Sequence, residues 1–193
     1  MTRRSMTMAA LCTLLAALLA GFAIAPSCSR QVGTEEGTPV DTEIMAFLSE
    51  ARALHHEANL KEDGGDLAGA TSAMDRLVTA RRPHAERKAT PEVEEVLADA
   101  YARLAELRLK QADLDGAAAA VKSGLEHVLE PTYFRGHLIE VQGLVEEARA
   151  ARLSDAGNAA EAARAREHAI QLLEEVVKIQ EQVIQRSLAK DGG

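Results

Sequence analysis

GDLAGA at residues 65–70, ADLDGA at 112–117 and GNAAEA at 157–162 are three versions of one short connecting turn. Each has aspartate or asparagine at its second position, a residue type that caps the start of a helix. Their last residues, 70, 117 and 162, are 47 and 45 positions apart, which indicates an internal repeat. The sequence therefore predicts three helical hairpins, each turning at one of these stretches.

Capping residues and helix breakers between the turns divide the chain into six predicted helices. Most of the predicted starts have a residue that can cap a helix, and proline follows Thr90 at the first helical position. We expect the helices from Asp41 to about Asp63, from Asp66 to before Pro83, from Thr90 to before Asp113, from Asp113 to before Leu129, from after Thr132 to about Leu153, and from Asn158 to near Leu188.

The composition favours helices that approach one another closely. Hydrophobic residues make up 47% of the 193 residues, but aromatic residues only 3%, and tryptophan is absent. Alanine and leucine must therefore supply the core, and both are strong helix formers. The sequence predicts an all-α protein. Its formal net charge of −8 argues against a nucleic acid partner, because phosphates require a basic surface.

The middle hairpin resembles a tetratricopeptide repeat (TPR). Tyr101, Leu104 and Ala105 stand at the positions of the family's Trp-x-x-Leu-Gly pattern, Ala117 at the small residue of its second helix, and Gly124 at the later small site. The resemblance implies a TPR-like α-solenoid, that is, an array of three antiparallel helical hairpins over residues 41–190.

The resemblance is looser elsewhere in the chain. Arg108 stands where the family prefers tyrosine, Val121 replaces a phenylalanine, and Glu57 of the first hairpin stands where leucine is expected. In the third hairpin, Leu144 and Ala148 align once a short insertion near residues 149–154 is allowed.

The long last helix has apolar residues at helical spacing. These residues are Ile170, Leu173, Val177 and Val183. We expect them to pack on the final hairpin, so that the C-terminal helix caps the array.

Residues 1–27 have the features of a signal peptide. Arg3 and Arg4 provide a positive start, and the run from Met8 to Ala25 carries no charge. A transmembrane anchor is the alternative, since 18 uncharged residues reach the lower limit for a membrane span. The run ends in Pro26 rather than in basic residues, and this favours export with cleavage.

Cys28 is the candidate for lipid attachment. Ala25-Pro26-Ser27-Cys28 resembles a bacterial lipobox, whose cysteine becomes the lipidated N-terminus. Ordinary cleavage after Ser27 remains the alternative. With residues 1–27 removed, Cys28 is the single remaining cysteine, and lipidation would protect its thiol from oxidation. Residues 28–40 would then form a flexible tether, and the protein would be anchored on the periplasmic or cell-surface side of a bacterial envelope.

The sequence predicts a binding protein rather than an enzyme. It contains no nucleophile elbow, phosphate loop or paired-cysteine metal motif, and we predict no catalytic residue, cofactor or metal site. His55 and His56 suggest a metal site of the helical-bundle type, but no Glu-x-x-His motif repeats elsewhere. A helical-bundle protein that binds a metal or cofactor is therefore the alternative function, and an enzyme ranks third.

The TPR resemblance implies that a partner binds to the inner face of each hairpin's first helix. On the first two hairpins this face carries a polar stripe, with Ala102 as its one small residue. Such a shallow surface suits a helix or an extended peptide better than a small molecule. The predicted binding residues for this unknown protein or peptide are Arg52, His55, Asn59, Glu62, Asp99, Arg103 and Glu106.

Overall fold

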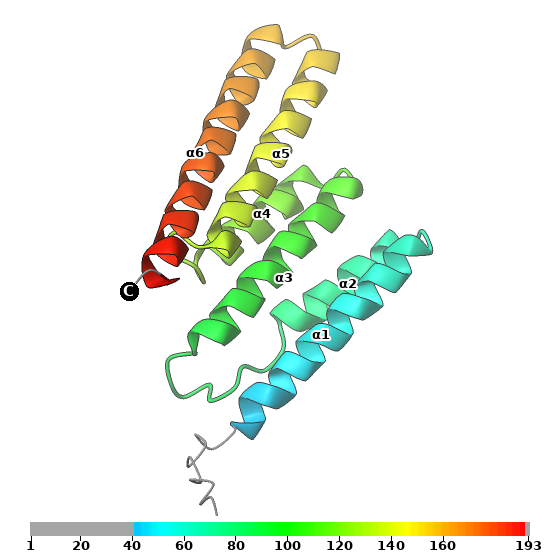
Figure 1. Ribbon diagram of the computed structural model, residues 1–193. Coiled ribbons are helices and arrows are strands. Elements are labelled where there is room, and N and C mark those ends of the chain that lie inside the picture. The colour runs from blue at the N-terminus through cyan, green and yellow to red at the C-terminus, as the bar shows by residue number, and fades with distance from the viewer. Residues whose placement is uncertain (1–40, 192–193) are drawn as a thin grey trace, which may run out of the picture. The chain divides into compact units, whose positions relative to one another are not determined.

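The computed structural model describes residues 41–191, in which every regular element is an α-helix (Figure 1). The helices are α1 (Thr42–Asp63), α2 (Leu67–Val78), α3 (Pro91–Lys110), α4 (Leu114–Leu125), α5 (Tyr133–Asp155) and α6 (Ala159–Asp191). The predicted all-α class is confirmed. The predicted signal peptide (1–27) and the lipidated cysteine with its tether (28–40) lie outside the described residues.

Three aspartates cap helices as the sequence predicts. Asp41, Asp66 and Asp113 each accept a hydrogen bond from a first-turn backbone N–H, over 2.8 to 3.1 Å. Thr90 precedes α3 as predicted, but its side chain makes no capping hydrogen bond. Pro91 begins that helix without the help of a cap, because its ring already fixes a helical φ.

The three repeated turns share a backbone geometry. The first residue of each turn is left-handed: φ is +80° at Gly65, +60° at Ala112 and +79° at Gly157. Glycine adopts this conformation at little cost, whereas the Cβ of Ala112 makes it strained. The equivalence of the three turns in the sequence thus extends to their conformation.

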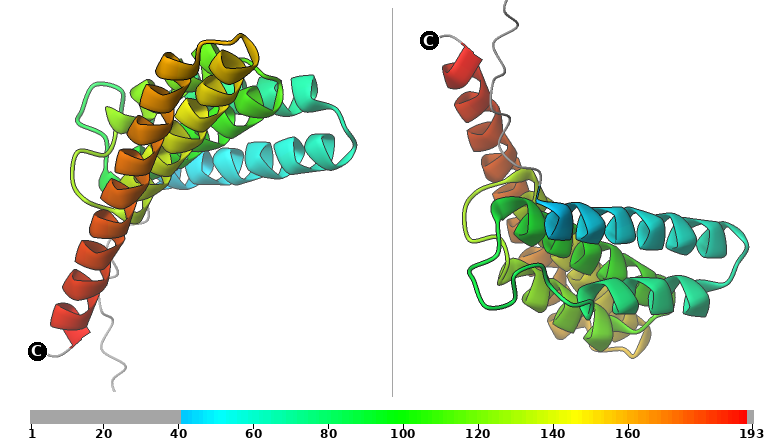
Figure 2. Two further views of the ribbon diagram at one scale, coloured as in Figure 1. Left: turned by 90° about the horizontal axis from the view of Figure 1, so that it is seen from above. Right: turned by 90° about the horizontal axis from the view of Figure 1, so that it is seen from below.

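Consecutive helices pack as neighbouring antiparallel pairs, α1 with α2, α3 with α4, and α5 with α6 (Figures 1 and 2). Helix α3 lies between the first and last pairs, since it also contacts α1, α2 and α5. Among the six helices, α6 packs against α5 alone. None of the helices in residues 41–191 is long and apolar enough to span a membrane.

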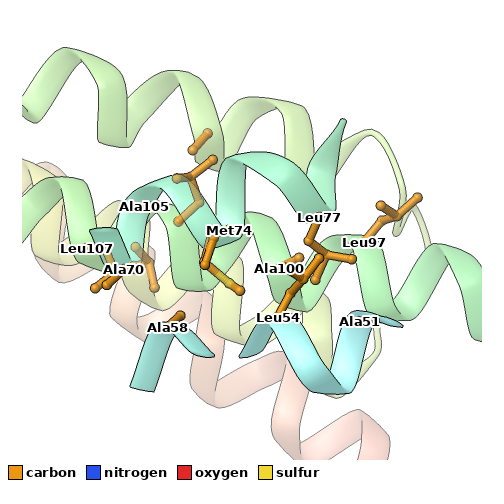
Figure 3. Close-up of a cluster of buried hydrophobic side chains, with 14 of the residues drawn as sticks. Ala51, Leu54, Ala58, Ala70, Met74, Leu77, Leu97, Ala100, Ala105 and Leu107 are labelled. Carbon is orange, nitrogen blue, oxygen red and sulfur yellow. The ribbon is translucent and has the colours of Figure 1, made fainter. Parts of the chain in front are cut away.

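Small side chains at the helix contacts build much of the main core, part of which is shown in Figure 3. Ala58, Ala70, Ala105 and Ala117 are completely buried, as the alignment of the hairpins predicts. Leucines and Met74 fill the space between these alanines. Close packing of this kind makes the core sensitive to a single added methylene group.

The predicted packing side of α6 is wrong. Ile170, Leu173 and Val177 are 52%, 42% and 58% exposed, and of the four predicted residues only Val183 packs against the buried cluster that joins α5 and α6. The side that faces α5 is instead formed by small and branched residues: Ala162, Ala169, Leu172, Val176, Ile179 and Val183. Because α6 has apolar residues on two adjacent sides, helical spacing alone does not select the buried one.

The alignment of the third hairpin is also wrong in its phase. Leu144, placed at an apolar motif position, is 39% exposed, whereas Val141 and Val145 are buried. Helix α5 continues without interruption to Asp155.

Candidate binding site

Six of the seven predicted binding residues belong to one connected set of ion pairs and hydrogen bonds. We call this set the polar network, and it lies on adjoining faces of α1, α3 and α5. Its members are His55, Asn59, Glu62, Asp99, Arg103, Glu106, Lys110 and His137.

Arg103 is the centre of the polar network. Its Nη2 donates to Oδ1 of Asn59 over 3.1 Å and also binds the Glu62 carboxylate, while its Nη1 donates to Oε2 of Glu106 over 3.1 Å. Lys110 binds the other oxygen of Glu62. The hydrogen bonds from Lys110 and Arg103 lower the pKa of Glu62, so this carboxylate stays charged. The guanidinium thus connects α1 to α3.

His137 extends the network from α3 to α5. Its Nε2 lies 3.2 Å from Oε1 of Glu106, and its Nδ1 lies 4.0 Å from Oδ1 of Asp99. The hydrogen bond between His137 and Glu106 raises the pKa of His137 and lowers that of Glu106. The sequence analysis did not select His137, because no local motif surrounds it and it meets Glu106 only through the packing of α5 on α3.

Asp99 lies between two histidines. Its Oδ2 is 3.6 Å from Nε2 of His55, whereas its other oxygen, Oδ1, is the one 4.0 Å from Nδ1 of His137. Burial lowers the pKa of His55, since desolvation disfavours the imidazolium more than Asp99 favours it. The two histidines beside one carboxylate therefore have pKa values shifted in opposite directions.

Two residues of the predicted stripe lie outside the network. Arg52 is exposed on α1 and forms no ion pair with any other residue between 41 and 191. Ala102, predicted to be exposed, is completely buried in a cluster with Val128 and Leu138. The prediction failed because α5 covers this position of α3.

Two departures from the TPR pattern form ion pairs. Glu57 accepts from Nη1 of Arg76 over 3.1 Å, which joins α1 to α2. Arg108 donates to Asp75 of α2 over 2.9 Å and to the Gly116 carbonyl of α4 over 3.1 Å. Where the motif has apolar or aromatic side chains, this chain uses charged contacts between neighbouring helices.

The surface combines carboxylates, cations, imidazoles and an amide. Such a mixture can donate to and accept from a peptide backbone or its polar side chains. Within residues 41–191, no group of three His, Cys, Asp or Glu side chains is placed to hold a metal ion.

Comparison with known proteins gave no matching family model and no significant match to a curated protein or a solved structure. The functional argument therefore rests on the residues and their arrangement.

Proposed function

We propose that this protein is a non-catalytic adaptor, tethered to a membrane, which binds a protein or peptide partner on the surface formed by α1, α3 and α5. In this proposal the helices form a TPR-like array of three hairpins. The repeated left-handed turns and the pairing of consecutive helices support it.

The polar network is the observation that carries the proposal. It runs across the first helix of each consecutive pair, where the TPR resemblance implies that a partner binds. Arg103, Glu62 and Glu106 satisfy one another's charges, so they are suited to fixing the positions of their neighbours. This leaves the more exposed groups, Arg52 and the amide nitrogen of Asn59, to meet a partner directly.

An extended peptide or a helix would fit these groups. Arg52 can bind a carboxylate through two parallel hydrogen bonds, and the Asn59 Nδ2 can donate to a peptide carbonyl. The Asp99 side chain is 40% exposed and can accept from a backbone N–H.

The test compares the proteins captured from envelope extracts by the wild type and by two variants. Arg52→Ala removes an exposed cation of the proposed binding face, whereas Lys122→Ala removes an exposed cation of α4. We expect Arg52→Ala to lose the specific partner and Lys122→Ala to retain it. Identical profiles for all three proteins would contradict the proposed site, and stoichiometric metal or a chromophore in the purified protein would contradict the adaptor function.

The tether is tested separately through Cys28. If Cys28 carries the lipid, Cys28→Ala should move the protein from the membrane fraction to the soluble fraction, because a protein held by acyl chains loses its anchor with them. If the variant stays in the membrane fraction, residues 8–25 act as an uncleaved anchor and the lipoprotein proposal fails.

A further inference from the structure

Helix α6 carries an uncovered apolar stripe. Its members are Ile170, Leu173, Val177, Ile184 and Leu188, and they are 52%, 42%, 58%, 56% and 61% exposed. Half of the large hydrophobic residues exposed in the described part of the chain belong to this one helix. Figure 2 shows that the C-terminal end of α6 projects beyond the other helices, so no neighbouring helix covers the end of the stripe.

The stripe has the seven-residue period of a helix that pairs with another helix. Ile170, Val177 and Ile184 are β-branched residues spaced by seven positions, and Leu173 lies between the first two. In a heptad this arrangement places Ile170, Val177 and Ile184 at position a and Leu173 at position d; the next two d positions are Gln180 and Ser187, and Leu188 falls at position e. The α5-facing residues Val176 and Val183 immediately precede two of these positions. Helix α6 therefore has one apolar side on α5 and a second, adjacent side without a partner.

A row of glutamates borders the stripe. Glu167, Glu174 and Glu181 are also spaced by seven residues, at position e of the same heptads, and all three are exposed. Position e lies on the side of the stripe away from α5, since α5 occupies the g side. The e and g residues of paired helices set the choice of partner through their charges.

We infer that the α6 stripe docks an amphipathic helix of a partner protein, whose apolar residues repeat every seven positions and whose flanking residues are lysine or arginine. The apolar residues would cover the stripe, and the basic flank would face the glutamate row. The contact is separate from the polar network, so it does not depend on the function proposed for that surface.

A second copy of this chain fits the same surface poorly. In an antiparallel two-fold pair of α6 helices, position e faces position e, so the two glutamate rows would repel each other. In a parallel pair, position e faces position g, but α5 already occupies the g side. Charge complementarity thus favours a basic helix over self-association.

The test uses two synthetic peptides and the purified full-length chain. Both peptides have about four heptads with isoleucine and leucine at positions a and d; one carries lysine and the other glutamate at positions e and g. We expect the lysine peptide to bind at least about tenfold more tightly by fluorescence anisotropy, and less tightly as salt increases. Equal binding of both peptides, or binding of neither, would overturn the proposal.

Charge reversal on the protein sharpens the test. Glu174→Lys with Glu181→Lys should invert the preference toward the glutamate peptide. The matched control is Glu175→Lys with Gln182→Lys, which places two lysines at the same spacing on the opposite side of α6 and should leave the preference unchanged. If the control inverts the preference equally, net charge rather than the glutamate row determines binding, and the proposal fails.

The apolar part is tested by Val177→Glu with Ile184→Glu. Both side chains are exposed, so helicity should persist while the lysine peptide loses its affinity. Arg52→Ala should bind this peptide as the wild type does, which separates the stripe from the polar network. A dimer in sedimentation analysis that this double variant abolishes would show that a second copy occupies the stripe, contrary to the proposal.

Discussion

Arg103 of α3 donates a hydrogen bond from Nη2 to Oδ1 of Asn59 in α1 over 3.1 Å. The same guanidinium binds Glu62 of α1 and Glu106 of its own helix. Together these contacts join two helices that are 28 residues apart along the chain, from the end of α1 to the start of α3. A residue predicted to bind a partner therefore also holds the helices together.

This structural role separates Arg103 from Arg52 in a stability measurement. Arg103→Ala leaves Glu62 with Lys110 alone and removes a hydrogen bond to Asn59, so the free energy of unfolding should fall by about 1–2 kcal/mol. Arg52→Ala removes an exposed side chain and should change it by less than about 0.5 kcal/mol. Urea denaturation measures both values. If Arg103→Ala loses no more free energy of unfolding than Arg52→Ala does, the Arg103 contacts do not stabilise the fold.

Two alanines of α4 test the helix crossing. Ala117 is completely buried, whereas Ala119 is exposed. Ala117→Leu should lower the free energy of unfolding by about 1–3 kcal/mol, because the extra methylene groups overfill a close contact. Ala119→Leu should leave the melting temperature nearly unchanged. Similar melting temperatures for the two variants would contradict this packing of α4.

Two helical glycines should respond to alanine with opposite signs. A Cβ on Gly124 would lie 2.9 Å from the Cβ of Tyr101 and 2.5 Å from Leu138, and the Tyr101 atom cannot move without its backbone. A Cβ on Gly143 meets Leu173 at an ordinary 3.4 Å. Gly124→Ala should therefore lower the melting temperature. Gly143→Ala should raise it, because glycine is about 1 kcal/mol less favourable than alanine inside a helix. Thermal melts followed by circular dichroism measure both shifts.

The parts of the fold that the sequence predicts are those set by local chemistry. Asp41, Asp66 and Asp113 cap helices because an aspartate before a helical stretch can bond its first free N–H groups, wherever the helix later packs. The buried side of α6 depends instead on contact with α5. Two adjacent apolar sides, represented by Val176 and Val177, satisfy the same helical period, so the sequence does not decide between them.

In the candidate site, too, the features set within one helix were predicted and those set by contact between helices were not. Helical spacing places His55 and Asn59 on one face of α1 and Asp99 with Arg103 on one face of α3, and these sets do meet. The approach of α5 is not encoded in either helix. It brings His137 into the network, and this contact was missed for that reason.

The two histidines beside Asp99 predict opposite effects of pH on stability. The pKa of His137 is raised above its ordinary 6.5. The stability that protonated His137 adds to the fold is therefore fully present below pH 6.5 and is lost as pH rises through the raised value. The pKa of Glu106 is lowered below 4.5. The stability that ionised Glu106 adds to the fold is therefore present above pH 4.5 and is lost as pH falls through the lowered value. Their pair stabilises the fold most between about pH 4.5 and 6.5.

His55 acts in the other direction. Its pKa is lowered below 6.5 by burial, so the unfolded chain binds its proton first, and stability falls as pH decreases from 6.5 through the folded-state value. Relative to wild type, His137→Gln should therefore lose more stability at pH 6 than at pH 8, by about 1 kcal/mol, while His55→Gln should gain stability at pH 6 relative to pH 8. Urea denaturation of the three proteins at several pH values between 5 and 8 measures these differences. Parallel profiles for the two variants would contradict opposite pKa shifts from the burial of His55 and from the hydrogen bond between His137 and Glu106.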